Sequence, residues 1–213
     1  SPDSAPPTDA EVAATDPQRP QMREYWEQYF VGETPSGFRH VIVQPLSNRV
    51  DGRVEIQSVD QLTLNVGTLR RTQRLSQTIR QGAERSLERF TATLDSGPMR
   101  TEYDGKVQFG KLVVNQQFGP ENSNSYKAPW PSGAAGTLGV QQELWDRPMT
   151  LGEERSIQCL QPIIFQPSTV TLKAIGPAPV VFPGSDEFVS LLEIQSTVTI
   201  HANPEMESQR PSL

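Results

Sequence analysis

The side chains that most often carry out chemistry are scarce in this chain, which has one cysteine, Cys159, and two histidines, His40 and His201. A cysteine nucleophile needs a thiolate beside a base, usually a histidine that a third polar group orients. Cys159 alternates with Ile157 in a strand-like segment, where a free cysteine normally behaves as a small buried apolar residue. We therefore predict that Cys159 belongs to the core and is not a nucleophile.

Other catalytic patterns do not occur in the sequence. No G-x-S-x-G segment is present to expose a serine nucleophile. Gly133, Gly136 and Gly139 are spaced like part of a phosphate loop, but no Lys followed by Ser or Thr ends that segment. The histidines lie far apart, and no spacing typical of zinc or calcium ligands is found. We therefore expect no enzyme activity, no cofactor and no metal site within these residues.

Charged side chains indicate solvated surfaces rather than a site. The adjacent acids Glu153-Glu154 and Asp186-Glu187 stand in turn-like contexts. Residues 70–89 carry an excess of positive charge, because only Glu84 and Glu88 oppose six arginines: Arg70, Arg71, Arg74, Arg80, Arg85 and Arg89. Aromatic residues do not interleave with these arginines as they do in single-strand nucleic-acid platforms, and the net charge of −6 also opposes nucleic-acid binding. We predict a solvated sheet face that discourages edge pairing; contact with an anionic headgroup or a partner is the alternative.

The elements that position these side chains are predicted to be antiparallel strands. Val54–Val66 is the clearest, because apolar residues recur at its even positions. At about 3.3 Å per residue this strand would be roughly 40 Å long, a length that indicates a large curved sheet with one face covered. For residues 68–80 a strand is favoured, although Leu75, Ile79 and Ala83 also have helical spacing.

The remaining pattern completes a meander. Strands are predicted at 25–30, 38–43, 86–94, 99–103, 106–118, 155–172 and 188–200, with hairpin turns at 95–97 and at Asp104-Gly105. Residues 119–139 read as a loop around Trp130, a short helix follows near 138–146, and 176–184 reads as a Pro-rich crossing. We predict a mainly β fold: a large curved antiparallel sheet, half-barrel-like, with one or two short helices. Residues 22–202 would form one domain between a disordered segment, 1–21, and a flexible tail, 203–213.

One apolar stripe could line a concave side of this sheet. Its members are Leu62, Leu64, Val66, Val107, Phe109, Leu112, Val114 and Phe118, and Trp130 could close over a ligand held there. Such a stripe is usually core, covered by a helix or by the crossing segment. An open groove for an acyl chain or another apolar ligand is the functional alternative.

Four segments of the chain carry a family resemblance. They are the Trp26–Gly32 opening with Gly37-Phe38-Arg39-His40, residues 72–79 (TQRLSQTI), Lys127–Trp130, and residues 147–155 (RPMTLGEER). In this order they resemble the N-terminal, non-catalytic β-rich region of exported transglutaminase-like proteins of the planctomycete type. That resemblance implies catalytic Cys, His and Asp residues in a separate downstream domain, and no catalytic residue transfers to these positions. A looser similarity, of architecture alone, is to half-barrel lipoprotein carriers.

These observations predict a non-enzymatic binding or accessory domain that holds an apolar ligand or contacts a partner or envelope component. The alternative is an accessory fragment of a larger transglutaminase-like or cysteine-protease-like enzyme. The polar, Pro-rich residues 1–21 are typical of a linker, or of the spacer after a cleaved export signal or lipid anchor, which would place the protein in the periplasm or envelope. No apolar stretch approaches the roughly 20 residues of a transmembrane helix.

Overall fold

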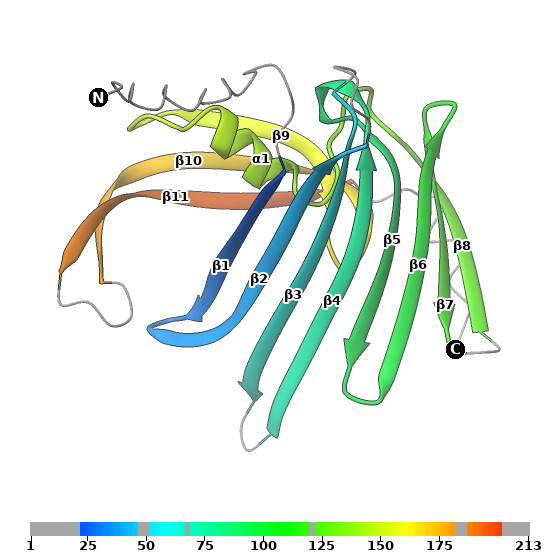
Figure 1. Cartoon of the computed structure of the whole chain (residues 1–213), viewed down its shortest axis with the longest axis horizontal. Coiled ribbons are helices and arrows are strands. Elements are labelled where there is room, and N and C mark those ends of the chain that lie inside the picture. Colours follow the sequence, from blue (N-terminus) through cyan, green and yellow to red (C-terminus); the bar gives the residue numbers. More distant parts are fainter. Residues whose placement is uncertain (1–21, 47–51, 67–68, 120–121, 182–186, 202–213) are drawn as a thin grey trace, which may run out of the picture.

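Two antiparallel sheets and one short α-helix make up the described part of the chain. A computed structural model describes residues 22–46, 52–66, 69–119, 122–181 and 187–201. Eight strands form a meander in the order β1 to β8, and β11, β10 and β9 form a second sheet whose strands run across the first (Figure 1). The predicted mainly β antiparallel meander is confirmed, and the large sheet does not close into a barrel. The predicted tails lie outside the described residues.

The element bounds follow the alternation of apolar and polar side chains. The strands are β1 Arg23–Val31, β2 Thr34–Pro45, β3 Val54–Val66, β4 Leu69–Gln81, β5 Leu87–Ser96, β6 Met99–Gln108, β7 Lys111–Phe118, β8 Asn122–Pro129, β9 Glu154–Gln161, β10 Gln166–Val181 and β11 Phe188–Ile200. The helix α1 spans Gly139–Asp146, and a single 3-10 turn spans Ala83–Arg85. The predicted strand at 54–66 and helix near 138–146 are confirmed.

The strand prediction for residues 68–80 is also confirmed from residue 69 onward, and residue 68 lies outside the described part. β4 pairs with β3 along its whole length and with β5 on its other side. Leu75 and Ile79 lie on one face of β4, and Leu87 and Phe90 lie on the matching face of β5. Two adjacent strands therefore produce the spacing that resembled a helix.

The predicted turn at Asp104-Gly105 is wrong. β6 runs through both residues, and the chain reverses instead at Phe109-Gly110, which both have positive φ angles. Gly105 lies opposite Phe90 of β5, and a Cβ atom at this position would overlap the Phe90 ring. This glycine therefore permits a close approach across the sheet rather than a turn.

Two further predictions about irregular segments are wrong. Residues 122–129 form the edge strand β8 rather than part of a loop, because Tyr126 and Ala128 alternate into the core. The Pro-rich segment at 176–181 continues β10 rather than crossing the fold, and residues 182–184 lie outside the described part. β9 pairs only with residues 166–173 of β10. Pro177 and Pro179 therefore occupy a stretch whose other edge has no β9 partner, where a missing N–H is tolerated.

The core lies on one face of the large sheet, here called the inner face. Ile56, Ile79 and Val114 are fully buried there. Phe165, from the turn between β9 and β10, stacks on Phe90 with ring centroids 4.8 Å apart. The second sheet and residues 130–138 therefore cover the inner face, and the opposite surface is here called the outer face.

Candidate functional site

The structure divides the predicted apolar stripe between several surroundings. Leu112 and Val114 are fully buried in the core, and Trp130 is buried with them. Val107 and Leu62 lie on the inner face and are half-buried. Leu64 and Phe118 are exposed toward strand ends, and Phe109 is fully exposed at the β6–β7 turn. Val66 lies in β3, and its side chain is not described. Leu112, Val114 and Trp130 are thus brought together in packed core, and Phe109 is separated from them.

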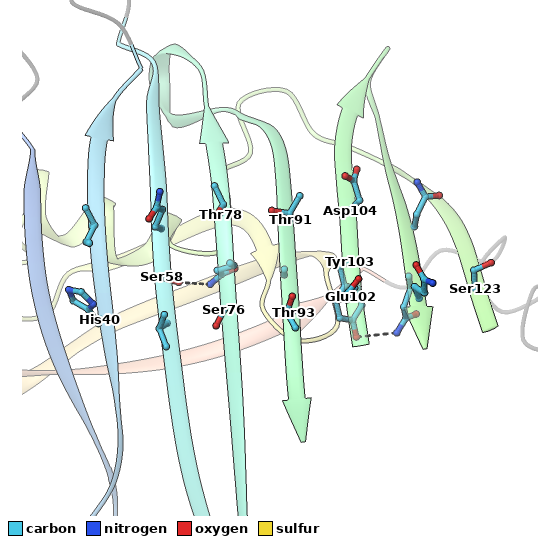
Figure 2. Close-up of a pocket in the computed structure, with 18 residues that line it drawn as sticks. His40, Ser58, Ser76, Thr78, Thr91, Thr93, Glu102, Tyr103, Asp104 and Ser123 are labelled. Atoms are coloured by element: carbon cyan, nitrogen blue, oxygen red, sulfur yellow. Dashed lines mark hydrogen bonds between the residues drawn. The ribbon is translucent and has the colours of Figure 1, made fainter. Parts of the chain in front are cut away.

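A cleft of about 670 Å³, lined mainly by Ser, Thr, Asn and Gln residues, lies on the outer face (Figure 2). Two cross-strand rows line it. The first row runs through His40, Val59, Ser76, Thr93, Glu102, Gln117 and Ser123. The second runs through Ile42, Gln57, Thr78, Thr91, Asp104 and Asn115. Because neighbouring strands lie about 4.8 Å apart, the first row is roughly 30 Å long.

The same alternation that builds the core projects these side chains outward. Ser76 and Thr78 flank Gln77, which is buried and bonded to Ser58 and Thr137 on the inner side. Thr91 and Thr93 flank the buried Ala92 in the same way. Successive strand residues point to opposite faces, so burial of one set determines the position of the other.

The ionisable groups of the cleft are paired with neighbours. The His40 ring lies 2.8 Å from a Glu24 carboxylate oxygen. Arg100 donates to Glu102 over 3.1 Å, and Arg89 donates to Asp104. The remaining polar groups are hydroxyls and amides. The cleft therefore offers many hydrogen-bond donors and acceptors with little uncompensated charge.

An exposed tryptophan extends the first row by one strand. Trp26 of β1 lies directly opposite His40. Its indole stacks on the His40 ring, with centroids 4.1 Å apart and planes 12° apart, and Phe38 lies 5.5 Å away. Nevertheless 63% of Trp26 remains exposed. An aromatic ring held in one orientation with one face open to solvent is a surface suited to stacking.

A partly buried ionic network holds β1, β2 and β3 together behind the cleft. Arg39 donates to Asp60 and, over 3.2 Å, to Glu27, and the Tyr29 hydroxyl donates to Asp60 over 2.6 Å. Burial raises the pKa of Glu27, and the Arg39 charge partly opposes that effect. The groups satisfy one another, so we assign this network a structural role.

A second cleft, of about 560 Å³, lies beside α1. It contains several arginines, but their charges are compensated. Arg85 and Arg155 both donate to Glu143, over 2.7 and 3.1 Å, and Arg85 also donates to Asp146. These pairs tie α1 to β9 and to the turn before β5. They leave no cluster of unpaired positive charge there to select an anion.

The residues first considered for chemistry are separated. Cys159 is buried, as predicted, with its sulfur 3.8 Å from the Ser168 hydroxyl, and burial raises the pKa of its thiol. The His201 ring bonds to Thr169, and His40 stacks on Trp26. Among the described residues, no group of three or more His, Cys, Asp or Glu side chains is placed to hold a metal ion.

Three arginines of β4 lie on the face that the alternation predicted, but that face also carries the cleft, which was not predicted. Arg70, Arg74 and Arg80 share the outer face with Ser76 and Thr78, as the alternation indicated. Arg80 pairs with Glu55 and Arg89 with Asp104. Sequence reasoning treated this face as solvated surface and so missed the cleft. Threonine and serine recurring on one face of adjacent strands, with Trp26 in line, was the available signal.

Fold and cleft together define an open, two-sheet antiparallel β protein with a cleft, rich in hydroxyl and amide side chains, on the face away from its core. No protein-family model matches the chain, and no curated protein matches it. A solved structure similar to the chain is a crystal structure of a β-barrel-like protein of domain of unknown function DUF1849 from Brucella abortus. The two are 11% identical with a TM-score of 0.48, over 76% of this chain and 69% of the other. In the described part of the chain, no helix has both the length and the apolar character needed to cross a membrane.

Proposed function

We propose that this chain is a non-catalytic binding domain whose outer cleft takes an extended, uncharged, hydroxyl-rich ligand such as a polysaccharide strand. One observation carries the proposal: a cross-strand row rich in hydroxyl and amide groups continues through Val59 and His40 to the exposed, oriented indole of Trp26. Sugars present hydroxyls at their edges and C–H groups on their ring faces. The row would bond the hydroxyls, and Trp26 would pack against a ring face.

Charge compensation supports an uncharged ligand. His40, Glu102 and Asp104 are the ionisable residues of the two rows, and each lies against an oppositely chargeable partner. A charged ligand would compete with those pairs and lose part of its own hydration. A neutral ligand adds hydrogen bonds without disturbing them.

The packing of the inner face favours this cleft over an apolar groove. Leu112 and Val114, which the sequence assigned to such a groove, are fully buried beneath other side chains. A long acyl chain would have to displace that packing, at a cost of several kcal/mol. The outer cleft, by contrast, is already open to a ligand.

Affinity electrophoresis of the full chain in gels containing soluble polysaccharides tests the proposal. The panel is hydroxyethylcellulose, glucomannan, laminarin and dextran as neutral polymers, with alginate as the anionic one. We expect at least one neutral polymer to slow the protein. Migration unchanged by all four neutral polymers, or slowed by alginate alone, would overturn the proposal.

Trp26→Ala should weaken that retardation about tenfold in apparent affinity, because exposed aromatic anchors contribute roughly 1–2 kcal/mol. Thr78→Val together with Thr91→Val removes two outer hydroxyls at nearly constant volume and should weaken it by a similar factor. Phe109→Ala is the matched control, since it removes an exposed aromatic at the β6–β7 turn that does not line the cleft. Equal loss in the control would show nonspecific adhesion. Circular dichroism checks that each variant is folded.

We also propose, from the family resemblance, that the domain is an exported accessory module of a longer polypeptide. Two of the resembling segments, Trp26–His40 and residues 72–79, supply His40, Ser76 and Thr78 to the cleft and Trp26 beside it. The intact mass of the endogenous protein tests this. A mass well above 23.6 kDa is expected, and a mass close to that value would contradict it.

A further inference from the structure

β11 forms an unusual sheet edge. One side of this 13-residue strand pairs with β10, and the other pairs with no strand among the described residues. Its sequence, FVSLLEIQSTVTI, contains one charged residue, Glu193, and neither proline nor glycine. Most of its side chains are exposed, including 74% of Phe188. A long apolar edge of this kind is a template for pairing with another strand.

The other edges carry features that discourage pairing. β1 has Arg23, Glu24 and Glu27, and its register shifts after Tyr29. β8 is short, with Lys127 and Pro129, and β9 begins with Glu154-Arg155. Charges, prolines and irregularities are the means by which native proteins protect sheet edges.

The contrast is sharpest within the second sheet itself. Beyond the end of β9, the outer edge of β10 carries Pro177 and Pro179, which cannot donate backbone hydrogen bonds. In the same ribbon, the edge of β11 has no comparable residue. One edge of the ribbon is blocked and the other is left able to pair, which points to an occupant for β11.

We propose that this occupant is β11 of a second copy of the chain, paired antiparallel about a two-fold axis at Ile194. The two three-stranded sheets would then form one continuous sheet of six strands. A two-fold interface uses the same surface twice, so the strand must be compatible with its own reversed sequence.

The reversed sequence of β11 meets that requirement. With Ile194 on the axis, Phe188 faces Ile200 of the second copy, and Val189 faces its Thr199. Glu193 faces Gln195 of the second copy, so the one charge in the strand meets a neutral amide rather than its own equivalent. Aromatic and β-branched residues opposite one another stabilise antiparallel pairs, and like charges opposite one another destabilise them.

Gln195 provides a charge test of this register. Gln195→Glu would place like charges opposite each other twice across the two-fold axis, and Gln195→Lys would create two opposite-charge pairs. By sedimentation velocity of the full chain, we expect wild type to show a species of twice 23.6 kDa. Its dissociation constant should rise about tenfold in Gln195→Glu and stay equal or fall in Gln195→Lys.

If the two substitutions acted only within one copy of the chain, their effects on stability would have the opposite signs. Gln195 lies opposite Lys173 of β10 in the same chain. Gln195→Glu would therefore stabilise the isolated ribbon and Gln195→Lys would weaken it, as thermal unfolding at low protein concentration can show. Dimer weakening by glutamate but not lysine thus reports contact between copies.

Three results would overturn the inference. Wild type could remain a monomer at hundreds of micromolar, a dimer could respond to neither substitution, or both substitutions could weaken it equally. The measurement is made without polysaccharide, so its outcome does not depend on whether the outer cleft binds a glycan.

Discussion

Gly105 in β6 faces the Phe90 ring in β5, which in turn stacks on Phe165 from the turn between β9 and β10. The glycine has room for no side chain, because a Cβ atom would occupy the position of the ring. Phe90 is itself buried almost completely. The absence of a side chain at this position therefore permits the close contact between β6 and the Phe90 ring.

Gly105→Ala should accordingly destabilise the protein by about 1–3 kcal/mol, the usual cost of overpacking a core. Urea unfolding measures the change. Phe90→Leu removes part of the ring, so alanine at position 105 should cost less in that background. Additive effects of the two substitutions would contradict the proposed contact.

Trp26 shows how exposure and order can combine in one residue. Its ring is fixed by stacking on His40, which is bonded to Glu24, and yet its outer side is open. A buried tryptophan such as Trp130 stabilises the fold by removing apolar surface from water, whereas Trp26 removes little. Its fixed orientation is the reason that it is placed in the proposed binding surface.

At the scale of elements, β1 pairs with β2 along its length, and two tyrosines connect it further to α1 and β3. The Tyr25 ring packs edge-on against Trp145 of α1, with centroids 4.0 Å apart. Tyr29 donates to Asp60 of β3. Burial raises the pKa of both hydroxyls, and nearby Glu27 adds to the effect for Tyr25. The buried Tyr25 oxygen also has no hydrogen-bond partner within the described structure.

These shifts predict a loss of stability in alkali. A raised folded-state pKa means that the native protein holds the proton more tightly, so its stabilising effect is complete below the unfolded value of about 10. It is lost as pH rises above that value. The free energy of urea unfolding should therefore fall between about pH 9.5 and 11.

Tyr25→Phe separates this effect from the titration of other groups. It removes an unbonded buried hydroxyl, so stability at neutral pH should stay equal or rise by about 1 kcal/mol. The alkaline loss should become shallower, because one titrating group is gone. If stability falls with pH as it does in wild type, the titration of Tyr25 does not contribute to the loss of stability in alkali.

Elements were predictable where a single alternating pattern governed them. β3 and β4 each carry more than ten residues of alternating apolar and polar side chains, and both form strands along that whole length. β8 was missed because its apolar positions, Tyr126 and Ala128, are too few to reveal a period. The prediction of one strand over 155–172 is wrong, because the chain reverses at 162–165 and residues 154–161 pair with β10 as the separate strand β9. The predicted strand also ended before Pro177 and Pro179, which normally end strands; whether they do depends on which edge has a neighbour.

At the scale of the whole molecule, the two sheets share one core. Leu160 of β9 and Phe165 of the β9–β10 turn belong to the same buried cluster as Ile79, Phe90 and Val114 from the first sheet. The sheets should therefore unfold together, in one transition seen equally by tryptophan fluorescence and by far-ultraviolet circular dichroism.

Phe165→Ala should lower the free energy of unfolding by about 3–5 kcal/mol, because it removes a large side chain from the core between the sheets. Phe109→Ala is a closely matched control, because both phenylalanines have left-handed backbone angles, φ 49° and 51°, but Phe109 is fully exposed. It should change stability by less than about 0.5 kcal/mol. Two separate transitions in wild type, or equal effects of the two substitutions, would contradict a shared core.

The sequence by itself determined the fold class, the long strands, the short helix and the burial of Cys159, because each depends on local periodicity or on a single residue's chemistry. The tertiary structure decided which face of the sheet is covered. The alternation of side chains assigns residues to two faces of the sheet but does not determine which face is buried. Only the contact of Phe165 and Trp130 with the inner face placed Leu112 and Val114 in the core and left Thr78, Thr91 and Trp26 as an accessible surface.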